Sequence, residues 1–202
     1  MIILLLGPHG AGKTTLGRAL SKHCGWAFHE ELGKTLANDP TFRPPSVRAC
    51  ELQPTFDREV FAREMERDFL FDAVQREQVR IVETWHPGNF GYAALRSPEV
   101  ALAMGPYLRE RINWSKVVVV PVSATAETLK ARKTCPESST FFLEVARLSL
   151  EVSLVFGARQ VPQVQTDSTP PADLAARLAP RLAGIGRAMR RRGAVVLPTL
   201  LM

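Results

Sequence analysis

The chain has 202 residues, of which 46% are hydrophobic and 23% are charged, so it can bury one sizeable core and has little apolar material for a second. We therefore expect a single domain over residues 1–202. The formal net charge of +6 favours an anionic partner such as a nucleotide, a polyphosphate or a nucleic acid, and charge alone does not choose among them.

Short apolar runs alternate with longer helical patterns along the chain. Strands are predicted at 2–6, 26–29, 80–83, 117–122 and 161–165, and helices at 13–23, 57–77, 124–133, 139–156 and 172–189. β-Branched runs separated by helices predict βαβ units and a mostly parallel sheet that is covered on both faces. Pro180 lies inside the last helical pattern, where we expect it to kink or interrupt the helix.

The apolar residues at the start of the sequence and the cysteines bear on the cellular compartment in which we expect the protein. Gly7 follows the apolar residues 1–6 at once, so this run is too short for a signal-peptide core or a membrane span. Cys24, Cys50 and Cys135 are far apart and odd in number, which excludes a disulfide framework and a cysteine metal site. We expect a soluble, unprocessed, cytoplasmic protein without a membrane partner.

The most specific motif follows the first predicted strand and precedes the first predicted helix. It reads Gly7-Pro8-His9-Gly10-Ala11-Gly12-Lys13-Thr14 and matches the phosphate-binding P-loop, G-x-x-x-x-G-K-[ST]. Glycines let backbone N–H groups curl around a phosphate at a helix N-terminus. We expect Lys13 to reach the β- and γ-phosphates of ATP and Thr14 to place its hydroxyl on Mg²⁺. The predicted nucleotide contacts are Gly7, His9, Gly10, Ala11, Gly12, Lys13, Thr14 and Thr15.

This P-loop, the chain length and the spacing of the later elements resemble the nucleoside and nucleotide kinase family, which includes deoxynucleoside kinases, thymidylate kinase and ribosylnicotinamide kinase. The resemblance implies a three-layer α/β P-loop NTPase fold, with a five-stranded parallel sheet of order 2-3-1-4-5 flanked by helices. It also implies an acceptor-binding insertion at about 34–56, a lid at about 130–140, and transfer of the γ-phosphoryl group from ATP with Mg²⁺. Many relatives form dimers, which leaves a homodimer open.

Two acidic positions follow from this resemblance. Segment 26–34 falls where the family's second strand ends in a glutamate that activates the acceptor hydroxyl, so Glu31 is the first candidate for a general base and Glu30 the second. Both could equally be surface charges. Glu83 ends the third strand, where the family has an acid that contacts hydrated magnesium. The family has an arginine next, but this chain has Thr84, which weakens the case for an acceptor that already carries a phosphate.

Candidate acceptor contacts lie in the loop expected after the third strand and on the helix 57–77. Trp85, His86 and Asn89 could shape an acceptor pocket. Core packing explains Trp85 equally well, and His86 is better explained as a loop residue without a function. Arg63 and Arg67 are four residues apart and share one helix face that could reach the acceptor. The alternative is a solvated helix with surface ion pairs.

Residues later in the chain could complete the site. Arg132 and Lys133 lie where the family has its lid and could neutralise charge on the transferring group, or they could complement the dipole of their own helix. Segment 165–171 resembles the family's loop around the adenine base, so Asp167 either contacts the nucleotide or caps the next helix.

Four functions compete on this evidence. The first is a kinase for a nucleoside or another small hydroxyl acceptor. The second is a kinase for nucleoside monophosphates, which needs an arginine clamp from Arg43, Arg48, Arg63 or Arg67. The third phosphorylates a hydroxyl of DNA or RNA, which the arginines at 187, 190, 191 and 192 permit. The fourth is a switch protein that hydrolyses its nucleotide to control a partner.

Overall fold

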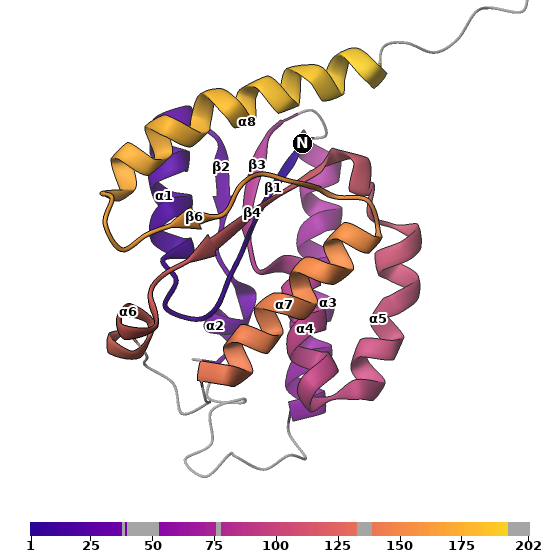
Figure 1. Cartoon of the computed structure of the whole chain (residues 1–202). Coiled ribbons are helices and arrows are strands. Elements are labelled where there is room, and N and C mark those ends of the chain that lie inside the picture. The colour runs from indigo at the N-terminus through magenta and orange to yellow at the C-terminus, as the bar shows by residue number, and fades with distance from the viewer. Residues whose placement is uncertain (38, 40–52, 76–77, 133–138, 194–202) are drawn as a thin grey trace, which may run out of the picture.

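The computed structural model describes residues 1–37, 39, 53–75, 78–132 and 139–193 as an α/β fold around a parallel sheet (Figure 1). The strands are β1 (Ile2–Leu6), β2 (Ala27–His29), β3 (Arg80–Glu83), β4 (Val117–Ser123), β5 (Arg159–Gln160) and β6 (Val164–Gln165). Their order is β2-β3-β1-β4-β5, with β6 also paired to β4, so the predicted order 2-3-1-4-5 is confirmed. The single strand predicted at 161–165 is replaced by the two short strands β5 and β6.

The helices cover both faces of this sheet. They are α1 (Lys13–Cys24), α2 (Leu32–Leu36), α3 (Gln53–Gln75), α4 (Trp85–Arg96), α5 (Pro98–Glu110), α6 (Ala126–Ala131), α7 (Ser139–Val155) and α8 (Pro171–Gly193), with a short 3₁₀ helix at Trp114–Lys116. Helices α1 and α8 lie together on one face, and α3, α4, α5 and α7 lie on the other (Figure 1). None of the described helices is both long and apolar enough to cross a membrane.

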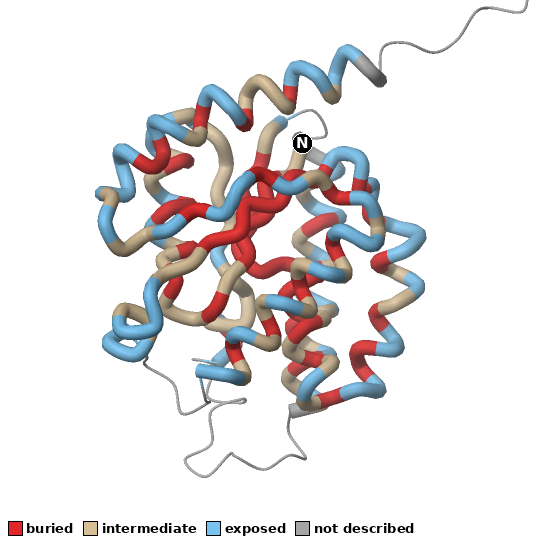
Figure 2. Tube along the Cα trace, viewed as in Figure 1, coloured by how far each residue is buried: buried red, intermediate tan, exposed pale blue. Residues whose placement is uncertain are grey.

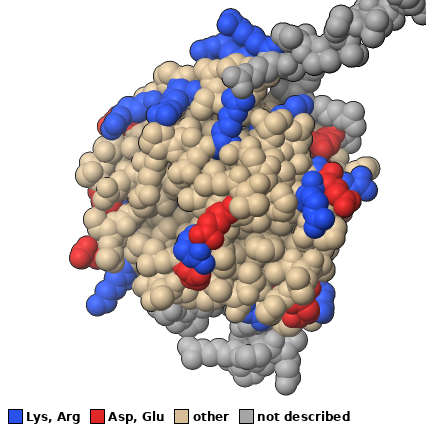
Figure 3. Space-filling model, turned by 45° about the vertical axis from the view of Figure 1, so that its right-hand side comes forward, with Lys and Arg blue, Asp and Glu red and all other residues tan. Residues whose placement is uncertain are grey.

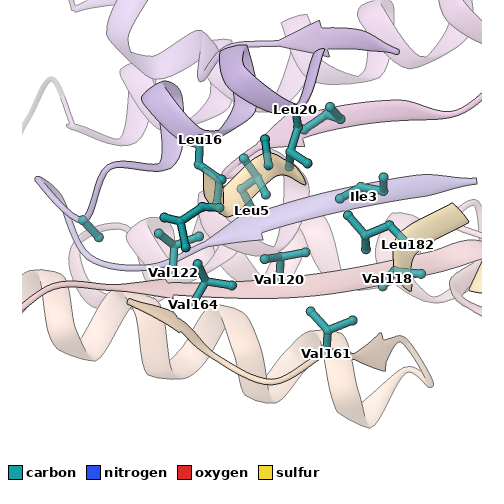
Figure 4. Packing of buried hydrophobic residues seen from close by; sticks show 14 residues of the cluster. Ile3, Leu5, Leu16, Leu20, Val118, Val120, Val122, Val161, Val164 and Leu182 are labelled. Carbon is teal, nitrogen blue, oxygen red and sulfur yellow. The ribbon is translucent and has the colours of Figure 1, made fainter. Parts of the chain in front are cut away.

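Alternation along the central strands divides the core into two layers. Ile3 and Leu5 of β1 pack toward α1 and α8, in the cluster that Figure 4 shows with Leu16, Leu20 and Leu182. Leu4 and Leu6 point to the opposite face and pack with residues of α4 and α5. Because both faces are covered, β1 and β4 are apolar along nearly their whole length, and the sheet forms the buried centre of the molecule (Figure 2).

Helices α4 and α5 are the main departure from the expected element pattern. Residues 85–89 were expected in the loop after the third strand, yet they form the first turn of α4, Pro87 and Gly88 included. Proline is tolerated there since the first turn has no helical acceptors for its N–H groups. Pro180 is also not a break: α8 runs through it as one helix (Figure 1). Pro180 is exposed, so water can satisfy the backbone carbonyl that loses its partner.

Helices α4 and α7 approach each other closely at a glycine. A Cβ atom on Gly91 would lie 2.6 Å from Ser149 Oγ and 2.7 Å from the Val145 carbonyl oxygen, so this contact has room for no side chain. Gly105 of α5, in contrast, has no heavy atom within 4 Å of the corresponding position. The close approach fixes the position of α4, the helix that starts directly after β3.

Candidate active site

The P-loop connects β1 to α1 with a backbone that glycine alone adopts readily. Gly10 and Gly12 have φ values of 82° and 86°, in the left-handed region, and Gly12 is the N-cap of α1. A Cβ atom on Gly7 would lie 2.0 Å from the Val122 carbonyl oxygen, so the loop rests directly on β4. The loop thus presents the N-terminus of α1 at the carboxyl edge of the sheet, which is an anion-binding arrangement.

Lys13 is buried and folded back onto this loop. Its Nζ donates hydrogen bonds to the carbonyl oxygens of Gly7, at 3.0 Å, and Pro8, at 3.2 Å. Burial lowers the pKa of Lys13, although the nearby carboxylates of Glu31 and Glu83 oppose this shift. A buried ammonium held by neutral carbonyl groups can turn to a more favourable negative partner.

Thr14, Lys34 and Glu83 form a compact cluster beside the loop. Thr14 Oγ1 donates to the Glu83 carboxylate, at 2.8 Å from Oε2 and 3.0 Å from Oε1. Lys34 Nζ lies 2.8 Å from Thr14 Oγ1 and 2.8 Å from Glu83 Oε1. Glu83 is only 1% exposed, so its charge requires a nearby cation.

A hard divalent cation suits these oxygen atoms. A hydroxyl and a carboxylate are the donors that Mg²⁺ prefers, and the cluster already attracts the ammonium of Lys34. No group of three or more His, Cys, Asp or Glu side chains suited to a metal occurs in the described part of the chain. Thr14 and Glu83 could therefore hold a metal that brings further ligands with it, as the phosphates of a nucleotide do.

The larger cavity at the P-loop has a volume of about 720 Å³ and is called here the P-loop cavity. It is lined by residues of the loop and α1 and by residues 166–171, and its other lining residues are Lys34, Glu83, Arg132 and Leu174. Thr166 Oγ1 donates to the Ala11 carbonyl oxygen at 2.8 Å, which joins segment 166–171 to the loop. Six of the predicted nucleotide contacts line this cavity: His9, Gly10, Gly12, Lys13, Thr14 and Thr15. Gly7 and the buried Ala11 do not line it.

Arg132 and Asp167 lie at this cavity with different partners. Arg132 Nη1 is 3.3 Å from the Gly10 carbonyl oxygen, so its guanidinium reaches the P-loop. Asp167 accepts hydrogen bonds from the backbone N–H of Thr125, at 2.9 and 3.0 Å, and so ties this segment to the start of α6. Of the two roles considered for Asp167, nucleotide contact or a cap on the next helix, these hydrogen bonds supply neither, because they lead to the N-cap of α6. Lys133 and most of the expected lid lie outside the described residues.

A second cavity, of about 190 Å³, opens between α2, α3, α4 and α7 and is called here the α3–α4 cavity. Its lining residues are His9, Glu31, Gly33, Lys34, Ala37, Phe56, Asp57, Val60, Asn89, Tyr92, Arg96 and Phe142. His9 and Lys34 line both cavities, which therefore meet at the P-loop. Asn89 lines this cavity as the sequence suggested. Arg43, Arg48 and most of the segment 34–56 lie outside the described residues.

The floor of the α3–α4 cavity combines charge with aromatic rings. Arg96 donates from Nε to both oxygens of Asp57, at 3.1 and 3.2 Å. Its guanidinium carbon also lies 5.0 Å from the ring centre of Tyr92 and 5.5 Å from that of Phe56. Asp57 is buried, so the pair is fixed in place and can present hydrogen-bonding groups to a ligand.

The two adjacent glutamates point to different places. Glu31 is the N-cap residue of α2 and lines the α3–α4 cavity, where its Oε2 accepts a hydrogen bond from Thr84 Oγ1 at 3.0 Å. Glu30 is exposed and pairs with Arg18 on the surface. Thr84, at the position where an arginine was expected, thus holds the Glu31 carboxylate. Thr84 and Trp85 both have positive φ values, 66° and 49°, which is strained backbone at a candidate site.

Trp85 and His86 are core residues, contrary to their suggested acceptor contacts. They are 1% and 0% exposed. Asp68 accepts from Trp85 Nε1 at 3.2 Å and lies 3.0 Å from His86 Nε2 and 2.8 Å from Arg80 Nη1. Burial lowers the pKa of His86 despite the opposing charge of Asp68, so its imidazole is neutral. Burial alone would raise the pKa of Asp68, but His86 and Arg80 outweigh it and lower that pKa. The charged form of the Asp68 carboxylate is therefore stabilised beside Arg80.

Arg63 and Arg67 do not line either cavity at the P-loop. Arg63 is exposed and pairs with Glu59 and Glu66 of its own helix, as the alternative reading held. Arg67 pairs with Glu64 and donates to the Glu30 carbonyl oxygen at 2.8 Å. Both line a separate hollow with His29 and Phe71. Neither arginine therefore lies in the wall of the P-loop cavity or of the α3–α4 cavity.

Several residues of these cavities escaped the sequence interpretation, among them Lys34, Asp57, Tyr92 and Arg96. Asp57 and Arg96 are 39 residues apart, on helices whose contact the sequence does not show. Tyr92 and Arg96 were missed because the region after Glu83 was interpreted as a loop. Their spacing of four residues, one helical turn apart, was the signal that could have placed them on one face.

Arginines collect along the exposed side of α8. The exposed ones are Arg177, Arg181, Arg187, Arg190 and Arg191, and Asp173 is the single acid of this helix. Elsewhere on the face drawn in Figure 3, basic and acidic side chains lie together, whereas the upper edge is basic. None of the ion pairs found among the described residues includes an arginine of α8.

Comparisons with known proteins place the fold. The family model described as AAA domain matches residues 2–179. Deoxyadenosine kinase from M. mycoides superposes with a TM-score of 0.62 at 12% identity, over 91% of this chain and 100% of that one. Shikimate kinase from Aquifex aeolicus gives 0.51 at 19% identity, over 91% of this chain and 97% of that one. NadR protein in complex with NR gives 0.59 at 17% identity, over 89% of this chain and 48% of that one.

No protein of curated function matches the sequence. At identities below 20% the structural likeness establishes the fold, which is that of P-loop kinases, and not the substrate.

Proposed function

Because the chain belongs to the AAA domain family and has the fold of P-loop kinases, we propose that it transfers the γ-phosphoryl group of ATP to a hydroxyl of a small acceptor, a nucleoside or a nucleotide. The observation that carries this proposal is the meeting of two cavities at the P-loop. One has the phosphate-binding loop in its wall, and the other has a carboxylate, Glu31. A protein that only hydrolyses its nucleotide needs no second cavity.

In this proposal the P-loop cavity binds ATP. The loop N–H groups and Lys13 hold the phosphates, with Lys13 turning from the Gly7 and Pro8 carbonyl oxygens to a negative partner. Thr14 and Glu83 would hold Mg²⁺, which neutralises phosphate charge when bound. Arg132 adds positive charge near Gly10. Segment 166–171 forms the opposite wall, against the rest of the nucleotide.

The acceptor lies in the α3–α4 cavity. Glu31 is the group there that can accept the hydroxyl proton as the oxygen attacks phosphorus, and Thr84 orients it. Glu30 is paired with Arg18 outside the cavity, so Glu31 is the better base of the two. Tyr92 and Phe142 offer aromatic faces to a planar group.

The charges of this cavity favour an acceptor without a phosphate. A phosphate monoester needs an arginine that is free to form a bidentate clamp. Among the described residues, Arg96 is the arginine that lines the α3–α4 cavity, and Asp57 already neutralises it. A nucleoside with hydrogen-bonding edges fits the Asp57–Arg96 pair better than a nucleoside monophosphate does.

The proposal is tested by ADP release from ATP and Mg²⁺ across nucleosides, nucleoside monophosphates, short DNA and RNA, and simple hydroxyl metabolites. Acceptor-dependent release with a nucleoside, lost in Lys13→Ala, supports it. Glu31→Gln should lower turnover far more than ATP affinity, whereas Glu30→Gln, the matched control, should leave turnover within about twofold. Release that ignores every acceptor instead indicates a nucleotide-hydrolysing switch.

A second candidate is phosphorylation of a hydroxyl on DNA or RNA. The specific observation that favours it is the row of exposed arginines on α8, which could contact a phosphate backbone. The same panel tests it: release with an oligonucleotide that falls steeply with added salt, and that weakens when Arg187, Arg190 and Arg191 are changed to Gln, would support this candidate.

A further inference from the structure

Lys34 occupies an unusual position for a residue that the P-loop motif does not include. It belongs to the short helix α2, yet its Nζ lies 2.8 Å from both Thr14 Oγ1 and Glu83 Oε1. These are the two side chains with the donor atoms for a divalent cation. The Lys34 side chain is 41% exposed, whereas Glu83 is 1% exposed. An accessible, flexible lysine therefore neutralises a carboxylate that is otherwise closed to water.

The ammonium and a metal ion cannot both use these oxygen atoms. Mg²⁺ binds oxygen at about 2.0–2.1 Å and demands near-octahedral geometry. A lysine nitrogen 2.8 Å from the same oxygens would stand within a few ångströms of the ion, where two positive charges repel strongly. Thr14 donates its hydroxyl proton to Glu83, and its oxygen accepts a hydrogen bond from Lys34. The Thr14 oxygen is therefore open to a metal only after Lys34 moves away.

The two cavities offer space into which the Lys34 ammonium can move when it leaves Glu83. It lines both the P-loop cavity and the α3–α4 cavity, and therefore stands on the boundary between them. Its long stem lets the ammonium move by several ångströms while α2 stays in place. Lys13 differs, because the carbonyl oxygens of its own loop hold it away from Glu83.

We propose that Lys34 is a resident cation of the metal position, which neutralises Glu83 in the free chain and which the metal of a metal–nucleotide complex displaces. This inference rests on the proposed function, since it presumes that ATP binds with Mg²⁺. It predicts that the wild-type chain gains less affinity from the metal than the Thr14–Glu83 pair could give. It also predicts that metal-free ATP benefits from the positive charge of Lys34.

The test compares ATP dissociation constants in excess Mg²⁺ and in EDTA by isothermal titration calorimetry. Lys34→Met should weaken metal-free ATP binding and strengthen binding with Mg²⁺, so the ratio of the two constants should rise about tenfold or more over wild type, as expected for loss of a charge-assisted hydrogen bond to a buried carboxylate. Lys34→Arg keeps the charge and should keep the ratio within about threefold. Lys22→Met removes the same charge from the exposed side of α1 and should leave the ratio unchanged.

An unchanged or smaller ratio in Lys34→Met would overturn the proposal and make Lys34 an ordinary phosphate-binding cation. Lys34→Gln gives the same comparison if the methionine variant does not fold. Wild-type chain that binds no ATP under either condition would instead refute the proposed function, so the two failures are distinguishable.

Discussion

Replacement of Gly91 by alanine should separate α4 from α7. The added Cβ would lie 2.7 Å from the Val145 carbonyl oxygen, about 0.7 Å short of the 3.4 Å at which ordinary contact begins. The neighbouring Ser149 Oγ already donates to that carbonyl, so neither atom is free to withdraw. Overpacking of this kind costs about 1–3 kcal/mol.

Gly105→Ala is the matched control, because both glycines lie inside helices and Gly105 has open space at the Cβ position. Alanine favours a helix interior by up to about 1 kcal/mol over glycine at either site. The difference between the two variants is therefore the packing cost alone, about 1–3 kcal/mol.

Urea unfolding followed by circular dichroism measures both free energies, and m-values equal to that of the wild type keep the comparison valid. Gly105→Ala should be the more stable variant throughout. Equal stabilisation of both variants, within about 0.5 kcal/mol, would refute the reasoning, since it would mean that α7 withdraws at no cost. Tyr92 and Arg96 follow Gly91 on α4, so the variant should also weaken acceptor binding while ATP binding persists.

Burial raises the pKa of Glu64 to about 7, although Arg67 opposes the shift, so the folded chain holds this proton more tightly than the unfolded chain does. This protonation contributes its full stability below about pH 4.5, and about 3 kcal/mol is lost as the pH rises to about 7. Glu64→Gln should remove this pH dependence from the free energy of unfolding measured with urea. Parallel plots of that free energy against pH for the wild type and the variant would contradict the prediction. Asp57→Asn should leave Arg96 with an unneutralised charge and raise the acceptor KM about tenfold, with the ATP dissociation constant unchanged as the control. Thr166→Val removes a partly buried hydrogen bond to the P-loop and should cost about 1 kcal/mol and weaken ATP binding, whereas unaltered binding would show that the loop needs no support from this side.

The parts of the fold that the sequence predicts are those whose signal is local. The P-loop and the neighbouring strands are contiguous runs of sequence that allow one structural interpretation each. The sheet order follows from the family resemblance that the P-loop supports. Helix α4 was missed because residues 85–89 were interpreted as the loop after the third strand. Its N-cap, Thr84, and its first residue, Trp85, have positive φ. Positive φ at a threonine and a tryptophan is a backbone feature that no local sequence pattern records.

The site shows the same division. Lys13, Thr14 and Glu83 were identified because motif and strand ends fix their places. Whether Glu30 or Glu31 faces the α3–α4 cavity could not be decided, because adjacent residues differ only in which partner, Arg18 or Thr84, the fold supplies. Pairs between distant segments, such as Asp57 with Arg96, have no counterpart in the sequence pattern until the helices are placed.

The two cavities have almost separate walls, with His9 and Lys34 as their shared lining residues. Helices α2, α3, α4 and α7 surround the smaller cavity, and α1 with the segment before α8 lines most of the larger one. Substitutions can therefore accumulate in the first group of helices without disturbing the second. Under the proposed function, a laboratory library confined to the α3–α4 lining would explore new acceptors while the phosphoryl donor stays the same, and a natural lineage could diversify by the same route.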